Sequence, residues 1–187
     1  MVKRKLRDFR KSGVDKSEKI RAQVKNLNEQ ITEIGSNFDQ TIREDTRYIE
    51  TTLEALDGLP TDFIASRQAD ENGKIKISTD YPDYFPIMQY AHSDELRRRL
   101  YIASKAIGSP SNSDNLIKLI TKRHELATLL GYENYAALAM DGLMMQSPIR
   151  AAEFLNELGV AVKTASKNDL AILLEREKKI NPEATEI

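Results

Sequence analysis

The sequence has no cysteine, no tryptophan and only two histidines among its 187 residues. Without cysteine the chain forms no disulfide and has no thiolate nucleophile or ligand, which fits a reducing compartment, and we expect a cytoplasmic location. No apolar run approaches the roughly 18 residues of a transmembrane helix, so no membrane span is expected. The N-terminal stretch MVKRKLRDF is basic but no apolar segment follows it, so we do not expect it to be a secretory signal.

Motifs that carry chemistry are also missing. The eight glycines are scattered and form no phosphate-binding loop, and no G-x-S-x-G occurs. His124-Glu125 begins like the zinc motif H-E-x-x-H, but position 128 is threonine, and the other histidine is the distant His92. A catalytic zinc usually takes three protein ligands. The sequence therefore predicts no catalytic, cofactor-binding or metal-binding residue in this chain, and His124-Glu125 is interpreted as a helix surface pair.

Charge is balanced overall, with a net charge of −1, but not locally. Residues 1–25 contain ten Lys or Arg and three Asp or Glu. Such an excess is typical of nucleic-acid or membrane contact, or of a solvated helix face. Phe9 is the one aromatic residue there, whereas single-strand binders interleave several with their basic residues. We therefore expect neither a nucleic-acid nor a membrane partner.

Apolar spacing predicts a mainly α fold. After a short basic helix over residues 3–11, an apolar residue recurs every three or four positions, which predicts one long amphipathic helix over about residues 16–57. The apolar series is Ile20, Val24, Leu27, Ile31, Ile34, Phe38, Ile42, Ile49, Leu53 and Leu56. This stripe either self-associates as a coiled coil or docks on the rest of its own domain. Together these two segments make up residues 1–60.

Residues 61–92 show other signals. A short helix begins near Thr61 or Asp62, Asn72-Gly73 is a hairpin signal, and the alternating residues 74–78 predict the one β element. The aromatic stretch TDYPDYFPIMQYA, residues 79–91, is expected to be an ordered connection that packs on the helices. The alternative for this stretch is an aromatic ligand platform.

Residues 93–187 are predicted to form a helical bundle. Ser93 caps a helix that Gly108 ends, a second helix runs from Asn112 or Ser113 to Leu130, and Gly131 takes its C-cap. A shorter helix covers residues 135–140, and Ser147-Pro148 begins a last long helix to about residue 179. We expect residues 1–187 to be a single helical region.

Read in order, these segments resemble the thimet oligopeptidase and oligopeptidase A family of zinc metallopeptidases. Five motifs carry the resemblance: NFDQTIREDT, LDGLP, YPDYFPIMQYA, LRRRLYIA and, most specific, RHELATLLGYENYA from Arg123 to Ala136. Asn112 lies eleven residues before Arg123, as in the family, and MMQSPIRAAEFLNEL follows in register. The similarity runs from about Leu6 to Ile187.

The resemblance implies a two-lobed, almost wholly helical enzyme that hydrolyses short peptides in a deep channel. In that family the H-E-x-x-H and a further glutamate ligand lie well C-terminal of this region, so zinc belongs to the full-length enzyme. We therefore expect the chain to be an internal fragment that supplies non-catalytic channel wall and is inactive alone. The alternative is a non-enzymatic helical interaction module that self-associates through residues 16–57.

Overall fold

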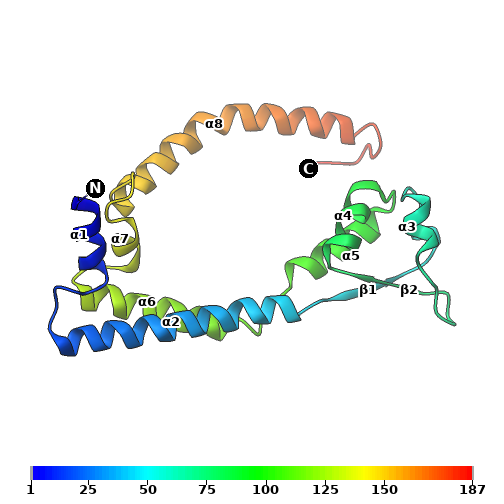
Figure 1. Ribbon diagram of the computed structural model, residues 1–187. Coiled ribbons are helices and arrows are strands. Elements are labelled where there is room, and N and C mark those ends of the chain that lie inside the picture. Colours follow the sequence, from blue (N-terminus) through cyan, green and yellow to red (C-terminus); the bar gives the residue numbers. More distant parts are fainter. Residues whose placement is uncertain (1, 187) are drawn as a thin grey trace. The chain divides into compact units, whose positions relative to one another are not determined.

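Helices make up most of the computed structural model, which describes residues 2–186 (Figure 1). In chain order the elements are α1 Val2–Lys11, α2 Glu18–Glu44, β1 Tyr48–Thr51, a 3-10 turn η1 Glu54–Leu56, α3 Thr61–Ala65, β2 Ile75–Ser78, α4 Tyr81–Tyr90, α5 Asp94–Lys105, α6 Ser113–Leu130, α7 Tyr135–Met140 and α8 Pro148–Glu177. The predicted fold class, mainly α with one small β element, is confirmed.

The chain divides into two compact units. Residues 25–123 form one unit, and residues 1–24 with 124–187 form the other. The core of the 25–123 unit joins η1, β2, α4 and α5. Its buried residues are Leu56, Leu59, Ile75, Ile77, Ile87, Ala91, Leu96 and Leu100.

The β element is a two-stranded antiparallel sheet in which β1 pairs with β2, with Ile49 opposite Ile77 and Thr51 opposite Ile75. The prediction of one helix over residues 16–57 is therefore wrong beyond Glu44. The β-branched residues Ile49, Thr51 and Thr52 favour an extended chain, and a lone β2 would leave its backbone groups without partners. A periodic apolar pattern could not reveal this pairing, because the partner lies about 25 residues away.

Asn72-Gly73 forms a turn but no hairpin, so that prediction was only half right. The side chain of Asp70 accepts hydrogen bonds from the backbone N–H of Asn72 (2.9 Å) and of Lys74 (2.8 Å), an Asx-type turn. The chain then enters β2, whose partner is β1 rather than a strand directly before the turn.

The aromatic stretch is a helix, α4, rather than the expected connection. Pro82 lies in its first turn, where a proline costs no helical hydrogen bond, and the buried Ile87 anchors it to the core. Expected core packing holds only in part, because Tyr81, Phe85 and Tyr90 remain 75%, 55% and 47% exposed. Tyr84 alone of these rings packs against the core.

In the other unit, α1 and the loop after it pack on the start of α2 and the end of α6. Val24 is 3% exposed and Leu130 6% exposed, and the buried Gly13 lies against both side chains.

The apolar residues that follow on α2 belong to the 25–123 unit, and they, including Leu27, Ile31 and Phe38, are half-buried within the chain.

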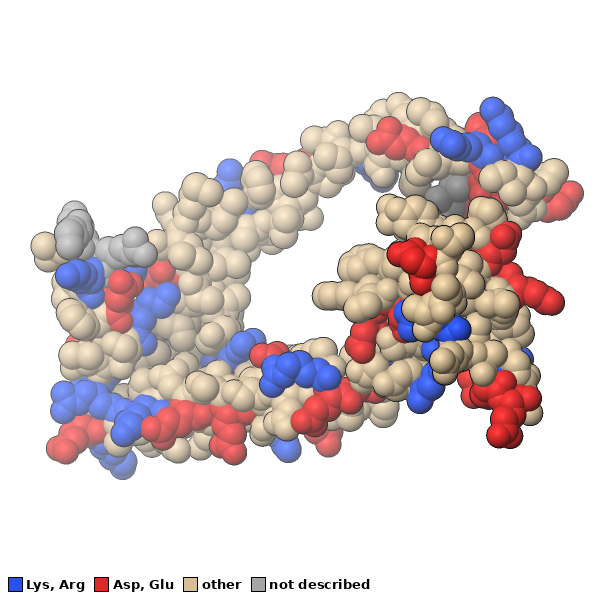
Figure 2. Space-filling model, turned by 45° about the vertical axis from the view of Figure 1, so that its right-hand side comes forward, with Lys and Arg blue, Asp and Glu red and all other residues tan. Residues whose placement is uncertain are grey.

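Helix α8 is 30 residues long, begins at the predicted Ser147 cap and contains no buried residue. Ser147 Oγ accepts a hydrogen bond from the Arg150 N–H at 3.2 Å. Its exposed large apolar residues are Ile149, Phe154, Leu155, Leu158, Val160, Val162, Leu170, Ile172 and Leu173. Figure 2 shows that uncharged surface predominates along this helix. Over residues 2–186, none of the helices combines the length and apolar character that crossing a membrane requires.

Candidate functional site

The two histidines lie in different units and neither belongs to a metal centre. His124 and Thr128 are both exposed on α6. His92 Nδ1 lies 3.0 Å from Asp57 Oδ2, in a pair whose side chains are both mostly exposed. Within residues 2–186 no three His, Asp or Glu side chains are grouped so that they could hold a metal ion. The described residues therefore do not fit a zinc site.

The His92–Asp57 pair closes the turn between η1 and α3 against the end of α4. The His92 N–H also donates to the Asp57 carbonyl at 3.0 Å. Between these contacts lies Gly58 at φ 92°, where a Cβ atom would meet the Tyr90 carbonyl oxygen at 2.4 Å. The hydrogen bond from His92 lowers the pKa of Asp57, and the electrostatic attraction of the His92 ring lowers this pKa further. This arrangement explains why LDGLP needs glycine at position 58.

Asp45 ties the end of α2 to the turn between α5 and α6. Its carboxylate accepts a bifurcated hydrogen bond from Arg47 Nε, at 3.2 Å to each oxygen, one from Arg47 Nη2 at 3.0 Å and one from the Gly108 N–H at 2.7 Å. Arg47 also donates to the Ser109 carbonyl at 2.6 Å. The Arg47 hydrogen bonds, followed by the one from Gly108, hold the pKa of Asp45 below its usual value. This carboxylate is thus a structural acceptor that links the end of α2 to the turn after α5.

Asp83 is the buried carboxylate of the core, at 6% exposure. It pairs with Arg67, and its Oδ2 accepts both the N–H and the hydroxyl of Ser78 at 2.8 Å. The Arg67 guanidinium also lies 4.4 Å from the centre of the Phe63 ring. One residue therefore joins α4 to the end of β2 and the segment after α3. The sequence reading singled out neither Asp83 nor Arg67, since nothing local marks a contact across 16 residues.

Around the most specific motif, the structure shows a helix end of the Schellman type. Gly131 has φ 92°, its N–H donates to the Thr128 carbonyl at 3.0 Å, and the Tyr132 N–H donates to the Ala127 carbonyl at 2.9 Å. The predicted C-cap is confirmed. Upstream on α6, Arg123 is half-buried and Glu125 is exposed.

The cavities of the 25–123 unit include two that lie beside motif residues. One, of about 170 Å³, is lined by residues of α2 and the start of α6, including Phe38 and Asn112. Asn112 Nδ2 there already donates to the Phe38 carbonyl at 2.9 Å. The other, of about 200 Å³, lies between the N-terminal end of α4 and the C-terminal end of α5. Its lining residues are Thr79, Tyr81, Tyr84, Ser104, Lys105 and Ile107.

The second cavity combines aromatic walls with hydroxyl groups and a lysine. The sequence pattern gave a signal for it, because an aromatic platform was the alternative weighed for residues 79–91.

Known proteins are similar to this chain over most of its length. The chain is 28% identical to saccharolysin of Saccharomyces cerevisiae over 92% of its length, and 27% identical to oligopeptidase A of Escherichia coli over 90%. It is 24% identical to a probable thimet oligopeptidase of Arabidopsis thaliana over 93%. In each case it spans only about a quarter of the relative, at 25%, 27% and 24%.

The family itself is shown by a second comparison. The sequence model of peptidase family M3 matches residues 87–186, which include α5, α6, α7 and α8. That match takes in more than half of the chain, including the Arg123 to Ala136 motif. The chain belongs to peptidase family M3.

Proposed function

We propose that this chain forms non-catalytic wall of a zinc metallo-oligopeptidase that hydrolyses short peptides. The observation that carries the proposal is the family M3 match over residues 87–186. The names of the relatives, saccharolysin and oligopeptidase A, support an oligopeptidase as the parent activity. Because the chain spans a quarter of each relative, the proposal assigns the zinc ligands and the general base to the remaining part of such an enzyme.

The hydrogen bonds that the acidic residues accept support an assignment of the general base to another part of the enzyme. Asp45, Asp57 and Asp83 each accept hydrogen bonds from neighbouring elements, so their charge stabilises the fold. A general base needs a free lone pair aimed at a substrate. We therefore expect these 187 residues alone to be inactive and to hold no zinc.

The surface of α8 supports a place inside a larger assembly. Large apolar side chains lie along it, with Val160 at 76% and Ile172 at 69% exposure. Monomeric proteins rarely leave so long an apolar surface uncovered. In this proposal the rest of the peptidase covers α8. The enzyme is placed in the cytoplasm, which suits a chain without cysteine.

The test is peptide hydrolysis by the protein encoded by the whole open reading frame that contains this sequence. A quenched fluorescent peptide of about ten residues should be cleaved, a chelator should abolish cleavage, and added zinc should restore it. Cleavage that resists chelation, or no cleavage of any short peptide, would reject the proposal.

A further inference from the structure

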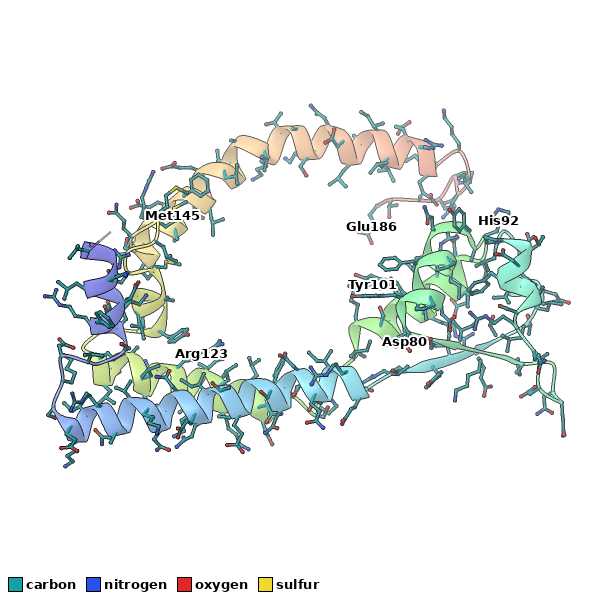
Figure 3. The ribbon with its side chains drawn as sticks, viewed as in Figure 1. Asp80, His92, Tyr101, Arg123, Met145 and Glu186 are labelled. Atoms are coloured by element: carbon teal, nitrogen blue, oxygen red, sulfur yellow. The ribbon has the colours of Figure 1, made fainter. Side chains whose placement is uncertain are left out.

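The cavity between α4 and α5 has an open aromatic rim. Tyr81 and Phe85 are 75% and 55% exposed, and their ring centres lie 5.2 Å apart. Tyr84 meets Phe85 edge-on at 5.7 Å. On α5, Tyr101 lies next to the lining residue Lys105, is 47% exposed and projects from the helix (Figure 3). Aromatic rings of this size are usually buried, so such a group in water favours contact with an apolar partner.

Lys105 gives the cavity its charge. Its ammonium lies 5.1 Å from the centre of the Tyr101 ring and, within residues 2–186, it forms no ion pair. Asp80, the acidic residue directly before α4, accepts a hydrogen bond from Thr46 Oγ1 at 3.3 Å. A cation held beside aromatic rings without a carboxylate partner favours an anionic ligand.

The two hydroxyl groups complete the polar set. Thr79 Oγ1 accepts a hydrogen bond from the Arg47 N–H at 3.1 Å, so its own hydrogen remains available for an acceptor. Ser104 Oγ donates to the Tyr101 carbonyl at 2.8 Å, which leaves its lone pairs for a donor. The cavity therefore offers a cation and a hydroxyl donor for an anion, and a hydroxyl acceptor for an N–H.

We propose that this cavity binds the C-terminal residue of a short peptide. Lys105 and Thr79 contact its carboxylate, Ser104 accepts its amide N–H, and Tyr81 and Tyr84 contact its side chain. The volume of about 200 Å³ is below the roughly 300–1,000 Å³ of pockets for drug-sized ligands, and it suits one amino-acid residue. The inference rests on the proposed function, because it takes a short peptide as the ligand.

The experiment compares two peptides that differ only at the C-terminus. An acetylated tripeptide ending in phenylalanine, with either a free carboxylate or an amide, is titrated into the 187-residue chain, and amide chemical shifts are followed by NMR. We expect the free acid to bind with a dissociation constant of about 1 mM, because one residue supplies most of the contact. Amidation should weaken binding about two- to fivefold.

Two variants test whether the affinity for the peptide depends on Lys105 in particular rather than on any lysine. Lys105→Gln should weaken binding of the free acid by the same two- to fivefold and remove the difference between acid and amide. Lys76→Gln is the matched control, because Lys76 lies 3.9 Å from the Tyr48 ring on the two-stranded sheet, away from the cavity residues. It should leave both affinities unchanged. Circular dichroism of both variants establishes that they remain folded.

Equal binding of acid and amide by the unmodified chain, shifts confined to residues away from the cavity, or equal effects of the two variants would each overturn the inference. Lys105→Gln in the longer enzyme distinguishes a failure of the cavity assignment from a failure of the proposed function. If peptides are hydrolysed but Lys105→Gln leaves KM unchanged for both C-termini, the cavity assignment fails and the peptidase stands. A rise in KM for the free acid alone, with kcat unchanged, supports the cavity.

Discussion

The Tyr132 hydroxyl donates a 2.6 Å hydrogen bond to Oδ2 of Asp141. Tyr132 follows the glycine that ends α6, and Asp141 directly follows α7, so one bond closes the chain around that short helix. Burial raises the pKa of Tyr132 to about 12, and the hydrogen bond and charge of Asp141 add to the effect. The contact gives a physical role to the tyrosine of the most specific sequence motif.

Replacing Tyr132 with phenylalanine should lower the free energy of unfolding by about 1–2 kcal/mol, because a half-buried carboxylate loses its donor. Urea unfolding at pH 7 measures this. The pKa of Tyr132 in the folded chain lies above its usual value of 10. The protonated hydroxyl therefore contributes its full stabilisation below pH 10, and this stabilisation is lost as pH rises toward 12. The stability difference between the two proteins should therefore shrink over that range. A difference that grows with pH would contradict the assignment.

Gly131 should be intolerant of any side chain for a purely backbone reason. A Cβ atom there has no neighbour within 4 Å, yet φ is 92°. Gly131→Ala should therefore destabilise the protein by roughly 1 kcal/mol. Gly35 is the control, since its Cβ also has no neighbour within 4 Å but it lies inside α2 without a positive φ. Gly35→Ala should stabilise by about 0.5–1 kcal/mol, and equal effects at both sites would refute the argument.

Asp45 should make stability depend on acid pH. Hydrogen bonds, chiefly from Arg47, hold the pKa of Asp45 in the folded chain below its usual value of 3.8. The ionised carboxylate therefore stabilises the fold fully above pH 3.8, and this stabilisation is lost as pH falls through the lower, folded-state pKa. Asp45→Asn should lower Tm at pH 7, and the difference from the unmodified protein should narrow below about pH 4. Differential scanning calorimetry from pH 7 to pH 2.5 follows both proteins. A constant difference in Tm would mean that the charge of Asp45 does not matter.

Burial should distinguish the stability contributions of two Asp–Arg pairs, Asp83–Arg67 and Asp94–Arg97. Asp83→Ala leaves the partly buried Arg67 and the Ser78 N–H without their acceptor and should cost about 3 kcal/mol. Asp94→Ala removes a pair on α5 whose carboxylate is 87% exposed, and it should cost less than about 1 kcal/mol. Denaturant unfolding of the two variants provides the comparison. Similar costs would show that Asp83 is not the buried link described above.

The features that the sequence predicted well depend on neighbours within a few residues. Ser93 and Ser147 cap α5 and α8, and Gly131 ends α6, because capping involves contacts three to five positions away. The failures involve distant partners. Strand β1 forms because β2 is available, and α4 forms despite Pro86 because Ile87 reaches a core that η1, β2 and α5 also build.

The candidate binding cavity shows the same limit. Tyr101, from the motif LRRRLYIA, has its ring 47% exposed beside Lys105. Which aromatic side chains reach the core is decided by the packing of α4 against α5 and β2, and spacing along the chain does not encode it.

The central claim is that these residues belong to a zinc peptidase without carrying its metal or its chemistry. The most direct measurement is zinc content per chain, by mass spectrometry after dialysis, made beside peptide hydrolysis. It compares the 187-residue chain with the longer protein that contains it. The account predicts one zinc and chelator-sensitive cleavage for the longer protein, and neither for the 187 residues alone. Stoichiometric zinc or peptide cleavage by the 187-residue chain, or a longer protein that cleaves without zinc, would contradict it.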